Sequence, residues 1–204
     1  MRSVKKRGGL FKANIPIIYT LLGVIEMVKV LIPLAEGFEE IEAVTVIDVL
    51  RRAGVNVTTV GIPGSLVVGS RNLRVNADKK LDDIDPEDYE AIVLPGGYPG
   101  YVNLGKTQKI MNIITSYNEE KKLIGAICAA PTILAKVGIL EDKKATVYPG
   151  MEKELPYPRS SKVVVDDHIV TSQGPGTAIE FSLKLIEILV GKDKAKAIKK
   201  DLVF

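Results

Sequence analysis

The only cysteine of the 204-residue chain, Cys128, lies in the stretch LIGAICAAPTIL. The apolar run Leu123–Ile127 before it predicts a buried strand, and a helix is expected from about Pro131, because proline is well tolerated in a first helical turn. Ala126 and Ala130 stand two residues to either side, and small residues there allow the sharp strand-to-helix bend that exposes hydrolase nucleophiles. A thiol at such a bend lies near a helix N-terminus, which lowers its pKa and favours the thiolate. The spacing fits a reactive nucleophile and a small buried hydrophobe equally well, and the residues alone leave both open.

A carboxyl group is expected on the apolar side of the first long helix. In the stretch AEGFEEIEAVTVIDVLRRAG at 35–54, a helical period places Glu42 on the same side as Val46 and Leu50. Burial would raise the pKa of this carboxyl, because desolvation disfavours the charged form, and the neutral acid could then donate a hydrogen bond. Glu39 would project the same way if the helix began early, so the periodicity does not separate the two glutamates.

A glycine pair follows another apolar run, in the stretch LPGGYPG at 94–100. Gly96 and Gly97 allow positive φ, so that backbone N–H groups could turn toward a ligand and hold a small anion. An ordinary strand-exit turn explains the pair as well. The pattern is neither G-x-G-x-x-G nor a phosphate-binding Walker loop, so it gives no nucleotide signal.

The chain alternates short apolar runs with amphipathic helical patterns. Strands are expected at 28–34, 56–62, 91–94, 123–127, 145–147, 163–165 and 168–172. Helices are expected at about 38–53, 103–120, 131–138, 177–190 and 193–200. This alternation predicts an α/β domain whose mostly parallel sheet is covered on both faces, with the functional crevice beyond the carboxyl ends of the strands.

Composition excludes several classes of function. The chain is 46% hydrophobic and 26% charged, which is typical of a soluble globular domain. Its formal charge of +3 comes entirely from residues 1–26, which carry +4, so no basic face remains for nucleic acid. One cysteine and one histidine make a metal site improbable, and this usage suits a reducing cytoplasm.

The first 26 residues form a segment of their own, in which basic residues precede an apolar stretch at 15–25. The stretch is too short to span a bilayer, and no small-residue cleavage site follows it. We interpret residues 1–26 as an N-terminal extension, or as a leader placed before a translation start at Met27, with a targeting segment as the alternative. Residues 27–204 are expected to form a single domain.

Four stretches together carry a resemblance: AEGFEEIEAVTVIDVLRRAG, VLPGGYPG, AICAAPTILA and TSQGPGTAIEF. They resemble the ThiJ/PfpI (DJ-one) superfamily, most closely its YajL- and DJ-one-like branch, from about Val28 to near the C-terminus. The resemblance implies a flavodoxin-like three-layer αβα sandwich, related to class I glutamine amidotransferase domains. It also implies a homodimer and no cofactor.

The same resemblance assigns roles to residues of this chain. Cys128 would be the nucleophile and Glu42 the protonated carboxyl that hydrogen-bonds its sulfur, which selects Glu42 over Glu39. The backbone amides of Gly97 and Ala129 would form the oxyanion site. The resemblance places three residues around the substrate pocket: Gly96, Arg71 and Pro175.

Two histidine positions depart from parts of the family. Members that act as peptidases have a histidine directly after the cysteine, where this chain has Ala129. Tyr148 stands at a position that a relative fills with histidine. His168, the only histidine, is expected at a strand start with a structural role. A complete Cys–His–acid triad is therefore not expected within one chain.

The last stretch also carries a purely structural signal. Thr177 and Glu180 have the spacing of a capping box for the helix that follows.

A thiolate beside a neutral acid and two amides suits addition to a reactive carbonyl compound. The resemblance implies a glyoxalase or protein-deglycase activity on small or protein-bound carbonyls, a function in stress defence. Two alternatives stay open: a redox sensor or stress chaperone that uses an oxidisable cysteine, and an intracellular cysteine peptidase that borrows a histidine from a neighbouring chain.

Overall fold

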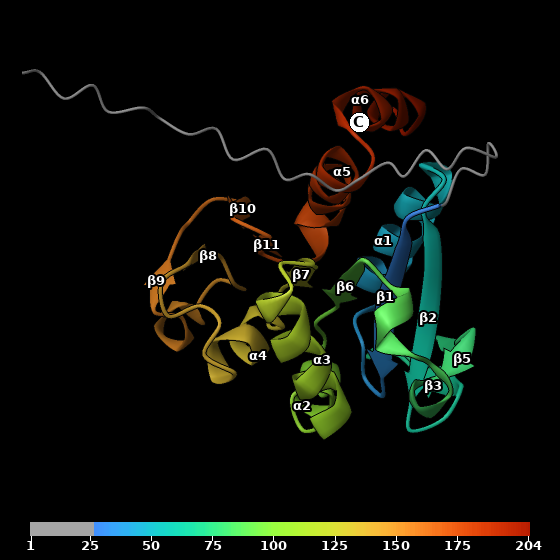
Figure 1. Cartoon of the computed structure of the whole chain (residues 1–204), viewed down its shortest axis with the longest axis vertical. Helices are drawn as coiled ribbons and strands as arrows, with labels where there is room; N and C mark the ends of the chain where they lie inside the picture. The colour runs from blue at the N-terminus through green and yellow to red at the C-terminus, as the bar shows by residue number, and fades with distance from the viewer. Residues whose placement is uncertain (1–26) are drawn as a thin grey trace, which may run out of the picture.

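The computed structural model describes residues 27–204, so the expected N-terminal extension lies outside the described residues. A seven-stranded sheet forms its centre, in the order β10-β11-β7-β6-β1-β2-β5 (Figure 1). Every neighbouring pair of strands is parallel except β10 and β11, which confirms the mostly parallel sheet. The strands are β1 (Lys29–Ala35), β2 (Asn56–Ile62), β5 (Lys79–Lys80), β6 (Ala91–Leu94), β7 (Leu123–Ile127), β10 (Val163–Asp166) and β11 (Ile169–Ser172).

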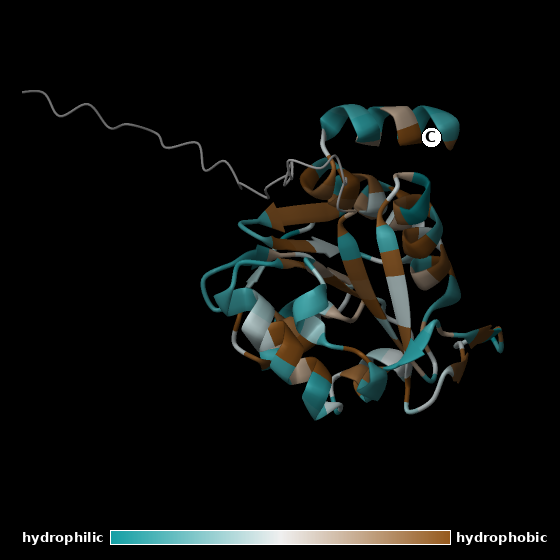
Figure 2. Cartoon of the chain, turned by 45° about the vertical axis from the view of Figure 1, so that its right-hand side comes forward, coloured by the Kyte–Doolittle hydropathy of each residue, from teal (hydrophilic) through white to brown (hydrophobic). Residues whose placement is uncertain are grey.

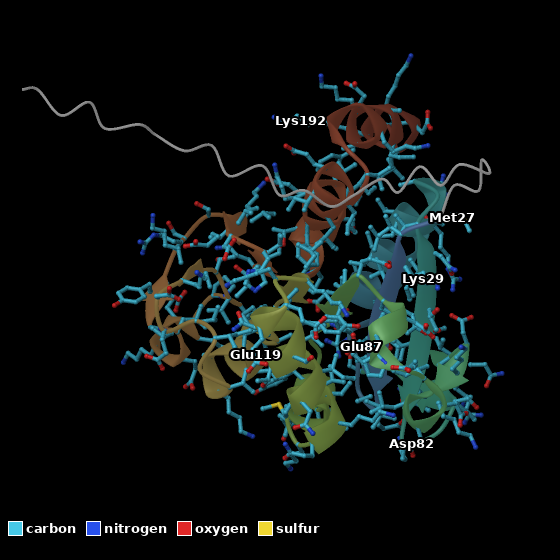
Figure 3. All side chains as sticks on the ribbon, viewed as in Figure 1. Met27, Lys29, Asp82, Glu87, Glu119 and Lys192 are labelled. Atoms are coloured by element: carbon cyan, nitrogen blue, oxygen red, sulfur yellow. The ribbon has the colours of Figure 1, made fainter. Side chains whose placement is uncertain are left out.

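Six helices in residues 27–204 complete three layers. One hydrophobic core lies between the sheet and α1 and α5, with α6 packed against α5, and a second lies between the sheet and α2, α3 and α4 (Figure 1). The helices are α1 (Glu40–Arg52), α2 (Gly100–Leu104), α3 (Gln108–Glu119), α4 (Pro131–Lys136), α5 (Ala178–Leu189) and α6 (Lys192–Asp201). Labels in Figure 3 mark Met27, where the described chain begins, and Lys192, where α6 begins.

The two-sided core follows from the pleat of the strands. In β1, Val30, Ile32 and Leu34 belong to the core under α1 and α5, whereas Leu31 and Ala35 belong to the core on the opposite face. Successive side chains of a strand point to opposite faces, so a strand buried on both sides must be apolar throughout. Truncating one such leucine to alanine typically costs about 2–5 kcal/mol.

A glycine in β7 lets α5 approach the sheet closely. A Cβ atom on Gly125 would lie 3.1 Å from the ring of Phe181 and 3.2 Å from the side chain of Val93. This close contact places α5 directly over β7, the strand that leads to Cys128.

The expected helix over 103–120 is in fact two helices, α2 and α3. Gly105 and the β-branched Thr107 are poor helix formers, and Thr107 adopts extended backbone before α3. The Thr107 hydroxyl donates to the carbonyl of Asn103, and Lys136 donates to the carbonyl of Gly105, both at 2.9 Å. The periodicity continues across this break and therefore hides it.

The ribbon of β3 (Leu66–Val68) with β4 (Arg74–Asn76) was not expected. The strand expected at 145–147 is β8 (Lys144–Ala145), which ends earlier than predicted and pairs with the unexpected β9 (Tyr157–Pro158) outside the central sheet. Strands of two or three residues are too short to give an alternating pattern. Figure 2 shows hydrophobic residues along the central strands and a largely hydrophilic α6. No helix within residues 27–204 is long and apolar enough to cross a membrane.

Candidate active site

Cys128 occupies the bend between β7 and α4, with a φ of 64°. Left-handed backbone in a residue other than glycine costs about 1–3 kcal/mol and persists only when the surroundings enforce it. Its N–H donates to the carbonyl of Ser172 at 2.9 Å, and its carbonyl accepts the N–H of Tyr148 at 2.8 Å. The nucleophile candidate is thus held on both sides by backbone hydrogen bonds, and its thiol is partly exposed.

Glu42 lies on the inner face of α1 and is completely buried. Its Oε2 accepts the N–H of Gly96 at 2.8 Å, while Oε1 has no hydrogen-bond partner within residues 27–204. Burial raises the pKa of Glu42 to about 7, against the opposing influence of the Gly96 N–H and the neighbouring Cys128 thiol. The burial and the raised pKa predicted for this carboxyl are confirmed.

Gly96 lies between the thiol and the carboxyl, where there is no room for a side chain. A Cβ atom there would lie 2.7 Å from Cys128 Cβ, 3.1 Å from its Sγ and 2.9 Å from Glu42 Oε2. The predicted pocket residue therefore has a steric role at the site. Its N–H already binds Glu42 and is not free to hold a substrate oxygen.

Gly97 places the second glycine amide at the sulfur. It has a φ of 89°, and a Cβ atom there would lie 2.3 Å from the backbone nitrogen of Glu39, so only glycine fits. The backbone amides of Gly97 and Ala129 both act on the Cys128 sulfur and favour its ionised form. The structure therefore brings Cys128, Glu42 and the two expected oxyanion donors together.

The thiol itself differs from the expectation. Burial and, after it, the negative charge of Glu42 together raise the pKa of Cys128 to about 12, against the amides of Gly97 and Ala129. The lowered pKa predicted from the helix N-terminus is wrong, because α4 has only six residues and its dipole is outweighed by desolvation. The repulsion from Glu42 is present only when that carboxyl is ionised.

Cys128 and Glu42 consequently titrate as a pair. The first proton leaves near pH 7 and the second near pH 12, so between these values the pair keeps one proton. A thiolate beside a neutral acid and a thiol beside a carboxylate contain the same number of protons. Shifting the proton from sulfur to carboxyl thus gives a nucleophile without any change in the charge of the site.

His168 lies at the opposite end of β11 from Ser172, the strand residue that binds the Cys128 amide. Its Nδ1 lies 3.1 Å from Asp167 Oδ2 and its Nε2 lies 3.0 Å from Asn118 Oδ1. Burial lowers its pKa. The structure places the imidazole in a packed, hydrogen-bonded position away from the thiol, as its predicted structural role requires.

The two remaining predicted pocket residues lie on turns. Arg71 is exposed in the β3–β4 turn, where its N–H binds Glu40 and its guanidinium donates to the carbonyl of Ser70 at 3.2 Å. Among the described residues it forms no ion pair, and nothing joins it to Cys128. Pro175 begins the turn that follows β11. No group of three or more His, Cys, Asp or Glu side chains in the described chain could hold a metal ion.

The capping box predicted for Thr177 and Glu180 is wrong. Thr177 makes no side-chain cap for α5. Its hydroxyl instead accepts the N–H of Gly174 at 3.1 Å and lies 2.6 Å from the hydroxyl of Ser172. Sequence reasoning also missed Ser172 and Tyr148 as partners of Cys128, because they act through backbone groups that every residue type carries.

Comparisons with known proteins show the family of the chain. The sequence model of the DJ-1/PfpI family matches residues 28–188. The chain is 40% identical over 178 residues to protein dj-1beta of Drosophila melanogaster, covering 85% of this chain and 95% of that protein. It is 36% identical over 170 residues to the glutathione-independent glyoxalase DJR-1.2 of Caenorhabditis elegans, covering 82% and 91%.

The solved structure of oxidized Toxoplasma gondii DJ-1 superposes with a TM-score of 0.85 at 41% identity, covering 87% of this chain and 98% of that one. The chain spans only 40% of the length of another relative, the DJ-1 homolog B of Arabidopsis thaliana, to which it is 40% identical over 176 residues, or 84% of this chain. These structural neighbours show the flavodoxin-like αβα sandwich that the sequence predicts. The chain belongs to the DJ-1/PfpI family.

Proposed function

We propose that this protein is a cofactor-independent glyoxalase that converts reactive 2-oxoaldehydes such as methylglyoxal into 2-hydroxy acids, as part of stress defence. The observation that carries the proposal is the pairing of a bent-backbone thiol, Cys128, with a buried carboxyl whose pKa is raised to about 7. A relative bearing the name of a glutathione-independent glyoxalase supports the same chemistry.

The first step is addition of sulfur to the aldehyde. Cys128 attacks the aldehyde carbon as the thiolate, a carbon–sulfur bond forms, and the carbonyl π electrons move to oxygen. The amides of Gly97 and Ala129 hold the developing oxyanion. The carboxyl of Glu42 then gives its proton to that oxygen, which leaves a hemithioacetal and a carboxylate.

Glu42 next acts as a base and then as an acid. Its carboxylate removes the proton from the former aldehyde carbon, and the electron pair moves to the neighbouring ketone to give an enediolate. Returning this proton to the second carbon, while the hydroxyl proton of the first carbon passes to the neighbouring oxygen, yields a thioester of lactate on Cys128. Water hydrolyses this thioester and regenerates the thiol, so the balance is methylglyoxal plus water to lactate and a proton, with no redox cofactor.

Replacing Cys128 by serine tests the proposal directly. Lactate formation from methylglyoxal, followed with purified full-length protein, should fall to the background rate in Cys128→Ser, because a serine hydroxyl ionises much less readily than a thiol. Retention of the wild-type rate in this variant would overturn the proposed nucleophile and the glyoxalase function with it.

A redox sensor or stress chaperone is the second candidate, because Cys128 is a free and partly exposed thiol. Two equivalents of hydrogen peroxide would convert it to a sulfinic acid with loss of two waters, and the amides of Gly97 and Ala129 would face the new oxygens. Selective gain of two oxygens on Cys128 in a mass spectrum, with no methylglyoxal turnover, would favour sensing. The peptidase alternative has less support, because the described chain supplies no imidazole near the thiol.

We further propose that the protein forms a homodimer in the cytoplasm. Apolar side chains are exposed on α1 at Ile41 (56%) and Val44 (46%), and on the β3–β4 ribbon at Leu66 (60%) and Leu73 (47%). We propose that these side chains lie together at the dimer interface, because contiguous exposed apolar surface marks protein–protein contacts. Sedimentation equilibrium of the wild type and of Val44→Lys would test it, and a monomeric wild type would contradict it.

A further inference from the structure

One turn of the chain, residues 173–177, contacts both backbone partners of Cys128. It begins after Ser172, whose carbonyl accepts the Cys128 N–H at 2.9 Å. Its Gly174 lies against the ring of Tyr148, whose Cδ2 is 3.4 Å from the position of a Cβ on that glycine. Tyr148 in turn donates its N–H to the Cys128 carbonyl at 2.8 Å. The turn therefore adjoins both residues whose backbone groups hold the bend at Cys128.

The hydroxyl groups of Ser172 and Thr177 form a buried hydrogen bond across this turn. Both residues are buried, and their oxygens lie 2.6 Å apart. Ser172 donates to the carbonyl of Lys162 at 2.9 Å, and Thr177 bonds the carbonyl of Gly174 at 2.8 Å and its N–H at 3.1 Å. Because each hydroxyl has one proton, the Thr177 proton is shared between Ser172 Oγ and the Gly174 carbonyl.

We propose that Thr177 is a positioning residue that holds Cys128 in its reactive backbone conformation, acting through the hydroxyl and the carbonyl of Ser172. The φ of 64° at Cys128 is unfavourable for a residue with a side chain and must be enforced by its neighbours. Removing the Thr177 hydroxyl leaves the buried Gly174 N–H without its partner and leaves Ser172 Oγ held only by its hydrogen bond to the Lys162 carbonyl. The turn then relaxes, and the sulfur moves relative to Glu42 and the oxyanion donors.

Ser182 provides a matched control. It is also completely buried, and its hydroxyl donates to the carbonyl of Ala178 at 2.7 Å within α5. Ser182→Ala therefore removes a buried hydroxyl hydrogen bond of similar length, but it does not touch the turn or Cys128. The comparison separates loss of stability from loss of positioning.

The experiment compares the full-length wild type with Thr177→Val, Thr177→Ser and Ser182→Ala. Three quantities are measured: the rate of Cys128 alkylation by iodoacetamide against pH, kcat and KM for methylglyoxal, and the thermal midpoint of unfolding. Thr177→Val should lower kcat roughly tenfold or more and shift the midpoint pH of alkylation, with KM little changed. Thr177→Ser should restore both, and Ser182→Ala should change only the thermal midpoint.

Only the kcat measurement depends on the proposed glyoxalase function. Alkylation reports on the Cys128 thiol whether or not the protein turns over methylglyoxal. A shifted alkylation profile in Thr177→Val supports positioning even if the wild type shows no methylglyoxal turnover, an outcome that would remove the glyoxalase function alone. Wild-type alkylation and kcat in Thr177→Val, with a lowered thermal midpoint, would overturn the positioning role. If Thr177→Val does not fold, Ser172→Ala is used instead, because it removes the hydroxyl contact between Ser172 and Thr177 and keeps the Ser172 carbonyl that accepts the Cys128 N–H. Wild-type alkylation in Ser172→Ala would likewise overturn the positioning role.

Discussion

A buried titratable group lies near each end of strand β11, His168 at one end and Glu42 at the other. The two groups differ in how completely they are hydrogen-bonded. At the N-terminal end, His168 has a hydrogen-bond partner for each ring nitrogen. At the C-terminal end, the Ser172 carbonyl accepts the Cys128 N–H, and the neighbouring Glu42 has a buried carboxyl oxygen with no partner among residues 27–204. Buried polar groups are normally satisfied, so an exception beside a strained residue marks a candidate for function. A fully partnered histidine fits a structural role.

The largest effect expected from this comparison is that of Glu42→Gln. Glutamine keeps the size of the side chain and an acceptor for the Gly96 N–H, but it cannot carry the proton between carbons. We expect kcat for methylglyoxal to fall roughly 10²- to 10⁴-fold. Glu119→Gln removes the same charge from an exposed position on α3 and serves as the control (Figure 3). An unchanged kcat in Glu42→Gln would exclude this carboxyl from the mechanism.

A smaller effect is expected on the pH dependence of stability. The pKa of Glu42 is raised from 4.5 to about 7 in the folded state, so the native protein binds its proton more tightly than the unfolded chain. This contribution is fully present below pH 4.5 and is lost as the pH rises to about 7, a change of about 3 kcal/mol.

Urea unfolding at pH 4.5 and pH 8 measures this contribution. The free energy of unfolding should decrease more between these two values for the wild type than for Glu42→Gln, which has no proton to lose. Equal decreases in the two proteins would show that Glu42 is not the group responsible.

The smallest effect on activity is expected at the other end of β11. His168→Ala removes hydrogen bonds to Asp167 and Asn118 and should lower the free energy of unfolding by about 1–3 kcal/mol. Both kcat and KM should stay within about twofold of the wild type, because the imidazole is absent from the site. A loss of kcat in His168→Ala as large as that in Glu42→Gln would favour a Cys–His mechanism and would contradict the structural role of His168.

Much of the fold could be predicted from local pattern. Strands β2, β6 and β7 begin and end at the expected residues, because continuous apolar runs bounded by polar or turn residues identify strands buried on both faces. The helical period also placed Glu42 on the buried side of α1. The break between α2 and α3, the β3–β4 ribbon and strand β9 were not predicted, because a short interruption or a strand of two or three residues shows no clear period.

The sequence alone therefore predicted the layers and a buried carboxyl on α1, and its spacing allowed a bend at Cys128, since each depends on residues close together along the chain. Only the tertiary structure decided the chemistry of the site. The Gly96 N–H reaches Glu42 across 54 residues, and the Cys128 amide reaches Ser172 on a neighbouring strand. The raised pKa of the thiol and the partners of Thr177 arise from such contacts. Desolvation and hydrogen bonding between distant segments are set by packing, and no local spacing of residues encodes them.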